Sequence, residues 1–242
     1  MSVRNTKNSA ECGRARQQTE DRLHSNSVVG GVASIELTRR CNLACPHCSL
    51  QSPEAAGGNA VELSRRQVIR IADGLADAGI SLMRLCGGEV YLRRDLEDIL
   101  RYLASRHVRV VLDTNGTLLT SRRATFLASV TPEWIEMPLF GATRETYEST
   151  TGVPGSFAMF QRGVEFLLRR RLPLRLRGIV LADRDDTAPA LQALANRMGV
   201  PLDWERVAPP RNGQRCNQVQ AADRTGLVRP VRAAGQVSVG AG

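Results

Sequence analysis

Short runs of apolar residues alternate with amphipathic segments along most of the chain. Between most of these runs, apolar side chains recur every three or four residues, which predicts helices that bury one face. The repeated order of strand and helix predicts a parallel sheet, because parallel neighbours need a crossover connection and such crossovers are right-handed. The predicted strands span residues 32–37, 80–85, 108–112, 134–139, 174–181 and 201–207.

Boundary signals mark the ends of several predicted helices. Ser64 is expected to cap a helix that ends at Gly79, and Asp95 to open the next one. Ser156 is expected to begin a longer helix, and the last helix ends at Gly199. A short helix is expected near residues 120–128. The predicted buried positions are Val68, Ile71, Ala72, Leu75 and Ala78, then Leu96, Ile99, Leu100 and Leu103, then Phe157, Phe160, Val164 and Leu167, and finally Leu191, Leu194 and Ala195.

These elements predict an α/β fold, a partial (β/α)₆ TIM-like barrel. A full eightfold barrel needs about 250 residues of regular repeats, and residues 208–242 show no further strand–helix pair. The core domain is therefore placed at residues 31–207. We expect residues 1–30 to be a disordered polar arm, and residues 208–242 a disordered or truncated tail that could leave the barrel incomplete.

The composition, 42% hydrophobic and 24% charged over 242 residues, is typical of a soluble globular domain. No apolar stretch is long enough for a membrane span, and the first thirty residues lack the apolar core of a signal peptide. We therefore expect a cytoplasmic protein with no membrane partner.

The net charge of +9 does not form a nucleic-acid-binding pattern. Residues 31–206 carry 23 basic and 20 acidic side chains, so two thirds of the excess lies in the two ends of the chain. Lys7 is the only lysine among 33 basic residues, and such a uniform arginine bias indicates a compositional habit rather than a phosphate-tracking groove. No basic patch interleaved with aromatic side chains is evident, so we expect no nucleic acid partner.

Three of the six cysteines lie within eight residues, in the sequence Cys41-Asn-Leu-Ala-Cys45-Pro-His-Cys48. A disulfide framework would spread its cysteines more evenly, whereas clustered cysteines in a cytosolic chain indicate a metal or redox site. The cluster follows the first predicted strand, where parallel α/β folds place their chemistry. The other cysteines are expected to be unliganded: Cys86 in the core, and Cys12 and Cys216 in the ends.

Two kinds of metal site fit three thiolates from one loop. Iron–sulfur clusters with four irons usually take four cysteines, so three would leave one iron open for a substrate or cofactor. The same cysteines with His47 could instead bind zinc as a Cys₃His site. His47 directly precedes Cys48, and adjacent side chains cannot easily reach the same ion. We therefore favour the iron–sulfur cluster and keep a zinc-binding interaction module as an alternative.

Four motifs in order resemble those of the radical S-adenosylmethionine (SAM) superfamily. The cysteine spacing is the first, and Leu85-Cys86-Gly87-Gly88-Glu89-Val90 resembles its Gly-Gly-Glu-Pro motif. Asp113-Thr114-Asn115-Gly116 resembles its common Thr-Asn-Gly turn. Leu139-Phe140-Gly141-Ala142, followed by Thr151-Gly152-Val153-Pro154-Gly155-Ser156-Phe157, resembles its peptide-maturing and cofactor-building branches. The resemblance covers about residues 32–207.

The resemblance implies that Cys41, Cys45 and Cys48 bind a [4Fe–4S] cluster and that SAM chelates the open iron. Reductive cleavage of SAM would then yield a 5′-deoxyadenosyl radical that abstracts hydrogen from a substrate, with the protein supplying orientation and excluding water. The implied partners are a peptide or small-molecule substrate, a reductant protein such as a flavodoxin or ferredoxin, and a protein that completes the open barrel. The alternative is a degenerate scaffold that holds the cluster without catalysis.

The resemblance also implies which residues contact SAM. The cofactor-binding residues would be Gly87 and Gly88, through a close backbone approach, Glu89, through the turn or the SAM ammonium, and His47, near the adenine.

Two residues depart from the family pattern. Val90 replaces the usual proline, and Pro138 stands where a polar residue often touches SAM. Arg175 and Arg177 share one face of their strand and could bind a carboxylate.

Overall fold

One sheet of seven strands forms the centre of the molecule in a computed structural model that describes residues 32–48, 62–181, 187–207 and 219–221. Neighbouring strands follow chain order, and the first six are parallel, which confirms the predicted α/β partial barrel. The strands are β1 (Val32–Thr38), β2 (Leu82–Gly87), β3 (Arg109–Asp113), β4 (Trp134–Leu139), β5 (Leu174–Leu181), β6 (Leu202–Val207) and β7 (Val219–Ala221).

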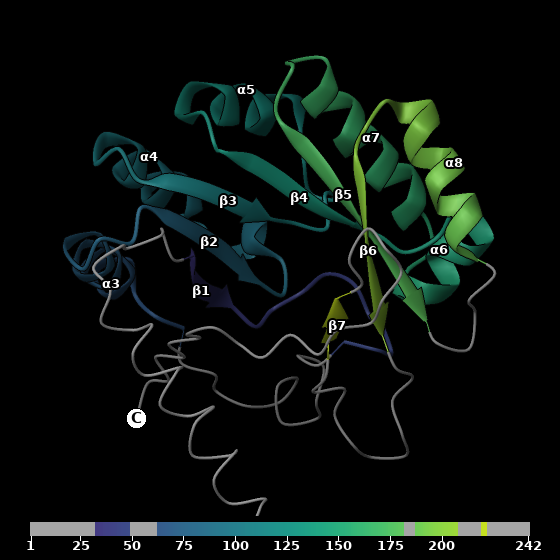
Figure 1. The fold of residues 1–242 in the computed structure, drawn as a ribbon, viewed down its shortest axis with the longest axis horizontal. Helices are drawn as coiled ribbons and strands as arrows, with labels where there is room; N and C mark the ends of the chain where they lie inside the picture. The colour runs from purple at the N-terminus through teal and green to yellow at the C-terminus, as the bar shows by residue number, and fades with distance from the viewer. Residues whose placement is uncertain (1–31, 49–61, 182–186, 208–218, 222–242) are drawn as a thin grey trace, which may run out of the picture.

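Helices follow the strands and pack around the outside of the sheet (Figure 1). They bury one continuous apolar core, in which Met83, Leu85 and Met137 are 0% exposed. The helices are α3 (Arg65–Asp77), α4 (Leu96–Ser105), α5 (Ser121–Val130), α6 (Arg144–Thr151), α7 (Ser156–Leu168) and α8 (Ala188–Met198), with a short 3₁₀ turn, η1 (Val90–Leu92).

Side chains alternate between the two faces of each strand, as a half-polar sheet requires. Ile135, Met137 and Leu139 of β4 face the helices and are 0% exposed, whereas Glu136 faces the other way. We call this second face, turned away from the helices, the inner face of the sheet.

The predicted helix boundaries are largely confirmed. Ser64 caps α3 in a full capping box with Gln67, and Gly199 ends α8 in the left-handed conformation. Asp95 precedes α4 as expected, but its carboxylate pairs with Arg93 instead of capping the helix.

Three elements were not predicted. Helix α6 has few apolar residues, and its only large buried side chain is Tyr147, so its sequence has no helical apolar period. The turn η1 and strand β7 are too short to give a pattern. Strand β7 lies within the predicted tail and pairs antiparallel with β6. The rest of that tail, the predicted arm, Cys12 and Cys216 lie outside the described residues.

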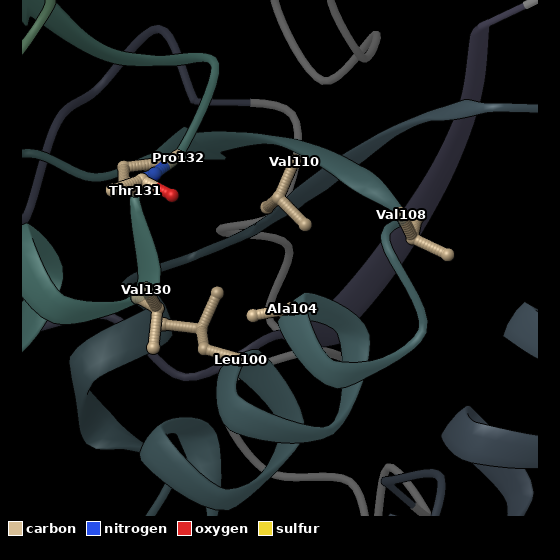
Figure 2. A pocket seen from close by; sticks show the side chains of 7 residues that line it. All are labelled: Leu100, Ala104, Val108, Val110, Val130, Thr131 and Pro132. Carbon is tan, nitrogen blue, oxygen red and sulfur yellow. The ribbon is translucent and has the colours of Figure 1, made fainter.

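A small pocket of about 10 Å³ lies between α4, β3 and α5 (Figure 2). This is room for about one water molecule. It lies at the start of β3, at Val108 and Val110, whereas the chemistry of parallel sheets lies at the carboxyl ends of the strands. We interpret it as a packing defect. Among the described residues, no helix is both long and apolar enough to cross a membrane.

Candidate functional site

The cysteine loop follows β1 at the carboxyl end of the sheet. Cys45 is 6% exposed, and Cys41 and Cys48 are half-buried. The backbone N–H of Cys48 donates to the carbonyl oxygen of Cys45 at 3.0 Å, and that of Leu43 donates to Cys41 Sγ at 3.4 Å. The loop backbone therefore holds the three predicted ligands together.

The end of α6 supports the cysteine loop from the other side. The backbone N–H of Ala44 donates to the carbonyl oxygen of Thr151 at 2.8 Å. Gly152 ends α6 with a φ of 69°, and a Cβ at this position would lie 2.8 Å from the carbonyl oxygen of Ala44. The buried hydroxyls of Thr151 and Ser156 share a hydrogen bond of 2.7 Å. The stretch from Thr151 to Ser156 thus supports the cysteine loop through its first two residues and is held by its own buried hydrogen bond.

The three thiols influence one another electrostatically. Burial, followed by the charges of Cys48 and Cys41, raises the pKa of Cys45 to about 12. Burial also raises the pKa of Cys41, with smaller contributions from Glu89 and Cys48. Thiols in this environment ionise only when a cation compensates their charge, which is how metal binding releases protons from cysteine ligands.

In the described part of the chain, no three His, Cys, Asp or Glu side chains lie close enough together to hold one metal ion. A zinc ion gathers all its ligands in one coordination sphere, whereas each cysteine of an iron–sulfur cluster binds a different iron.

The ring of His47 lies 5.5 Å from that of Phe140, and burial lowers the pKa of His47.

Tyr147 adds an unsatisfied donor that interacts electrostatically with Cys45. Its side chain is fully buried against Phe140, Phe157 and Phe160, and its hydroxyl has no hydrogen-bond partner among the described residues. Burial, and then the charges of Cys45 and Glu89, raise the pKa of Tyr147. An orphaned buried hydroxyl is costly unless it finds an acceptor, and a sulfur of a bound cluster would be one.

The two glycines of the Gly-Gly-Glu stretch allow β2 to approach the segment before Cys41. A Cβ at Gly87 would lie well under 3.0 Å from the carbonyl oxygen of Thr38, and one at Gly88 equally close to that of Arg40. The N–H of Gly88 donates to Thr38 O, and that of Glu89 to Arg40 O, both at 2.8 Å. This close backbone contact is enough to explain why both positions are glycine, with no ligand involved. The contact of the two glycines with SAM stays a prediction.

Glu89 fixes the turn, one of the two roles expected for it. Its side chain is 0% exposed, and Oε1 accepts from the N–H of Tyr91 at 3.0 Å and the hydroxyl of Thr114 at 2.8 Å. Oε2 accepts from the N–H of Asn115 at 2.8 Å. Burial raises the pKa of Glu89, although these three donors oppose the shift. The carboxylate therefore ties the end of β2 to the turn after β3.

The turn after β3 reaches the cysteine loop. Asn115 Nδ2 donates to Asn42 Oδ1 at 3.0 Å and lies 3.8 Å from Cys41 Sγ. The sequence indicated a turn here and missed the contact with the cysteine loop. Only the Thr-Asn-Gly resemblance marked the position.

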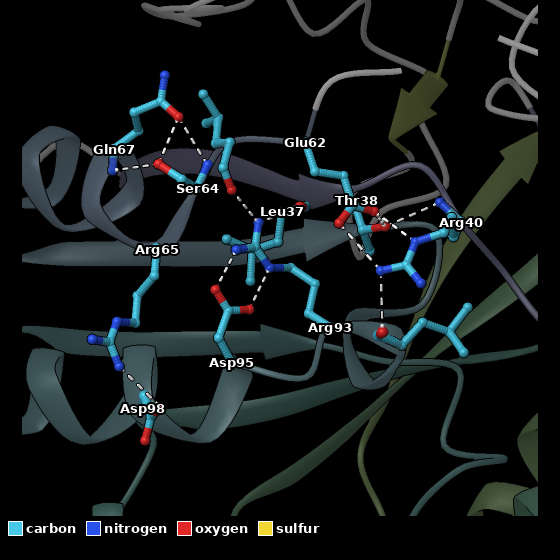
Figure 3. Close-up of polar contacts among 12 residues, drawn as sticks. Leu37, Thr38, Arg40, Glu62, Ser64, Arg65, Gln67, Arg93, Asp95 and Asp98 are labelled. Carbon is cyan, nitrogen blue, oxygen red and sulfur yellow. Dashed lines mark hydrogen bonds and ion pairs between the residues drawn. The ribbon is translucent and has the colours of Figure 1, made fainter. Parts of the chain in front are cut away.

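Arg93 holds the end of β1 in place (Figure 3). Its side chain is 4% exposed and donates to the carbonyl oxygens of Leu37 at 2.9 Å and Leu63 at 2.7 Å. It also pairs with Asp95 at 2.6 Å and so lowers the pKa of that carboxyl. One arginine thus joins β1, the start of α3 and the start of α4.

Arg40, the residue before Cys41, is anchored by a second set of contacts (Figure 3). It pairs with Glu62 at 2.8 Å and donates to the carbonyl oxygen of Leu92 at 3.1 Å. Glu62 also accepts a hydrogen bond from the hydroxyl of Thr38. These contacts fix the direction in which the chain leaves β1 and enters the cysteine loop.

The inner face of the sheet carries a network of charges. Arg84 of β2 pairs with Asp113 at 2.5 Å and Glu136 at 3.0 Å, and Arg177 of β5 pairs with Glu136 at 3.0 Å. Burial raises the pKa of Asp113, whereas for Glu136 the two arginines outweigh burial and lower its pKa. Opposite charges therefore line the inner face across four strands.

The remaining inner-face residues include several that the sequence singled out. Arg175 stacks on Trp134, with its guanidinium carbon 4.1 Å from the ring centre, and Pro138 is in register with Arg177. Both arginines thus face inward.

Cys86 was expected in the core, but it is half-buried and lies on this face because it alternates with Leu85, which packs under the helices.

Comparison with known sequences identifies related proteins. The profile of the Radical SAM superfamily matches residues 35–187. An AdoMet-dependent heme synthase from Oleidesulfovibrio alaskensis is 32% identical over 162 residues, which are 66% of this chain and 41% of the relative. The mycofactocin maturase MftC from Mycobacterium ulcerans is 33% identical over 179 residues, 74% of this chain and 47% of the relative. The chain spans less than half the length of these relatives.

Solved structures share the fold. SuiB of Streptococcus suis has a TM-score of 0.64 and 14% identity, both in the structure bound to its precursor peptide SuiA and in the one bound to S-adenosylmethionine. The matches cover 86% and 89% of this chain, and 46% and 49% of SuiB. At this identity the likeness concerns the fold.

Proposed function

The chain belongs to the radical SAM superfamily, and on that premise we propose that it is an enzyme that binds a [4Fe–4S] cluster and cleaves SAM reductively. The observation that carries the proposal is the cysteine loop, which places three buried or half-buried thiols at the carboxyl end of β1, one of which, Cys45, interacts electrostatically with the buried and unpartnered Tyr147. When bound, the cluster supplies the electron that cleaves SAM to methionine and a 5′-deoxyadenosyl radical, which takes a hydrogen atom from the substrate.

Cys41, Cys45 and Cys48 are the proposed cluster ligands. Each would bind one iron, and the fourth iron would be open to the amino and carboxylate groups of SAM. Their burial suits this role, because a partly desolvated thiol gains most from a positive charge nearby. The anchored segment before Cys41 and the end of α6 hold the loop from two sides.

Gly87, Gly88, Glu89 and His47 are the proposed SAM-binding residues. The backbone of the two glycines would approach SAM, and His47, half-buried against Phe140, would lie near its adenine. Both carboxylate oxygens of Glu89 already accept hydrogen bonds from the protein. Glu89 would therefore serve SAM by fixing the backbone around it rather than by direct contact.

The substrate would bind over the inner face of the sheet, which the charges of Arg84, Asp113, Glu136 and Arg177 make polar. We propose a ribosomal peptide or a cofactor precursor. The support comes from the names of the relatives, a heme synthase and a mycofactocin maturase, and from the precursor peptide bound to SuiB. A flavodoxin or ferredoxin would supply the electron.

The test is anaerobic reconstitution with iron and sulfide, metal analysis, and reduction by dithionite with SAM, followed by chromatography for 5′-deoxyadenosine. The expected result is four irons per chain and 5′-deoxyadenosine, both lost in Cys45→Ala. Cys86→Ala is the matched control, because Cys86 lies outside the loop, and it should retain both. Four irons and bound SAM without cleavage would favour a non-catalytic scaffold, and zinc in place of iron would refute the cluster.

A further inference from the structure

Asn115, Asn42 and Thr117 form a closed ring of hydrogen bonds next to Cys41. Asn115 Nδ2 donates to Asn42 Oδ1 at 3.0 Å, and Asn42 Nδ2 donates to Thr117 Oγ1 at 2.8 Å. The hydroxyl of Thr117 completes the ring by donating to Asn115 Oδ1 at 2.6 Å. Each amide thus uses its oxygen and one N–H within the ring.

A backbone group outside the ring fixes which way the Asn115 amide points. The backbone N–H of Thr117 donates to Asn115 Oδ1 at 3.0 Å, and because a backbone N–H can only donate, that atom must be the carbonyl oxygen. The NH₂ group therefore faces the cysteine loop. One of its hydrogens goes to Asn42, and the other is free for Cys41 Sγ, which lies 3.8 Å away.

The backbone of Asn115 is also held firmly. Its N–H donates to Glu89 Oε2 at 2.8 Å, and its side chain is 5% exposed. Gly116 follows with a φ of 77°, and a Cβ there would collide with Met137. The donor to Cys41 is therefore set in place by the fold before any ligand binds.

We propose that Asn115 is a positioning residue that donates a hydrogen bond to the Cys41 sulfur and sets the reduction potential of the cluster. This inference rests on the proposed function, because it needs a cluster at Cys41. Reduction adds negative charge to the cluster and its sulfurs, and an N–H aimed at a sulfur stabilises that charge. Loss of the donor should therefore make the potential more negative.

The test is a redox titration of the reconstituted protein, followed by the electron paramagnetic resonance signal of the reduced cluster. In Asn115→Leu, which removes the donor and keeps the branching of the side chain, the reduction equilibrium constant should fall about fivefold, as expected for one neutral hydrogen bond. For a one-electron couple this is about 40 mV more negative. Asn115→Asp, titrated at a pH at which the carboxyl is ionised, should shift in the same direction, because a carboxylate has no hydrogen to donate and places a negative charge beside the sulfur.

Asn115→Asp covers the case in which Asn115→Leu fails to fold, since Asp keeps an oxygen for the N–H of Thr117. Thr117→Val is the control. It opens the ring, but the backbone N–H of Thr117 still orients the amide, so its potential should equal that of the unmodified protein. An unchanged potential in a fully loaded Asn115→Asp would refute this inference and leave the cluster assignment intact. Failure of the unmodified chain to bind iron would instead refute the proposed function.

Discussion

The backbone N–H of Ala44 donates to the carbonyl oxygen of Thr151 at 2.8 Å and so joins the cysteine loop to the end of α6. The two residues are far apart in the sequence, and the contact depends on Gly152, the residue that ends the helix. A helix end of this kind can act as a brace, because its last carbonyl groups have no partner inside the helix. The geometry of the candidate ligands therefore depends on a helix that contains none of them.

Gly152→Ala should disturb iron binding more than stability. The left-handed φ of 69° costs an alanine about 1 kcal/mol, and the new Cβ would lie 2.8 Å from Ala44 O and push the loop away from α6. Gly199→Ala is the matched control, because Gly199 has a φ of 67° but no atom within 4 Å of the added Cβ. Both variants should lose similar stability in urea, and only Gly152→Ala should bind less iron. Equal iron content in the two would contradict the brace.

Gly88→Ala should lower both stability and iron binding. Its Cβ would meet the backbone of Arg40, which cannot move without shifting Cys41, so we expect a loss of about 2 kcal/mol or more. Gly74→Ala should act in the opposite direction. Gly74 lies inside α3 with nothing near its Cβ, so alanine should stabilise the protein by about 0.5–1 kcal/mol. Chemical denaturation of both variants, with metal analysis, checks the pair.

Glu89→Gln should reveal how far the turn depends on a carboxylate. Glutamine has one oxygen, so at least one of the three donors to Glu89 would face an NH₂ group in a site with 0% exposure. We expect a loss of about 1–3 kcal/mol in free energy of unfolding. Glu97→Gln, which weakens only an ion pair with the exposed Arg122, should change it by less than about 1 kcal/mol. A Glu89→Gln protein as stable as this control would show that the hydrogen bonds are dispensable.

The parts of the fold that the sequence predicted are those with a local apolar period. The strands over 134–139 and 174–181 were predicted with their observed bounds, because buried side chains alternate along the first strand and in the first half of the second. The second strand begins at Leu82, two residues later than predicted, because the N–H of Ile80 still closes the end of α3 on Leu75 O. Helix α6 went unnoticed because capping at Thr143 and contact with the loop stabilise it, rather than an apolar face.

The candidate site also has a part that the sequence predicted and a part that it did not. The three cysteines are close in the sequence, so their spacing alone indicated a metal site. The contacts that position them join distant parts of the chain, as between Asn115 and Cys41 or Ala44 and Thr151. Such contacts depend on the register of β1 against β2 and on the course of the connections. The local pattern of a single sequence gives neither this register nor the course of the connections.

Arg84→Met should destabilise the protein in a pH-dependent way. The variant keeps Asp113 and Glu136 on the inner face, with side chains 17% and 13% exposed, and removes the arginine that pairs with both. Leaving Asp113 without its cation, and Glu136 with Arg177 alone, costs about 3 kcal/mol near neutral pH. In the unmodified protein the pKa of Glu136 is lowered, so its stabilising contribution is present above the unfolded value, about 4.3, and is lost as the pH falls through the folded pKa.

The stability difference between Arg84→Met and the unmodified protein should therefore be largest at pH 7 and shrink towards pH 4, because protonation removes the charges of Asp113, which has lost its partner, and of Glu136, which keeps only Arg177. Urea denaturation across this range measures it. Arg109→Met is the control for the lost positive charge, since Arg109, at the start of the neighbouring strand, pairs with Glu133 in a solvent-exposed ion pair. Its effect should be small across this range, because water screens an exposed pair. A difference for Arg84→Met that does not change with pH would mean that the arginine stabilises the sheet by packing rather than by its charge.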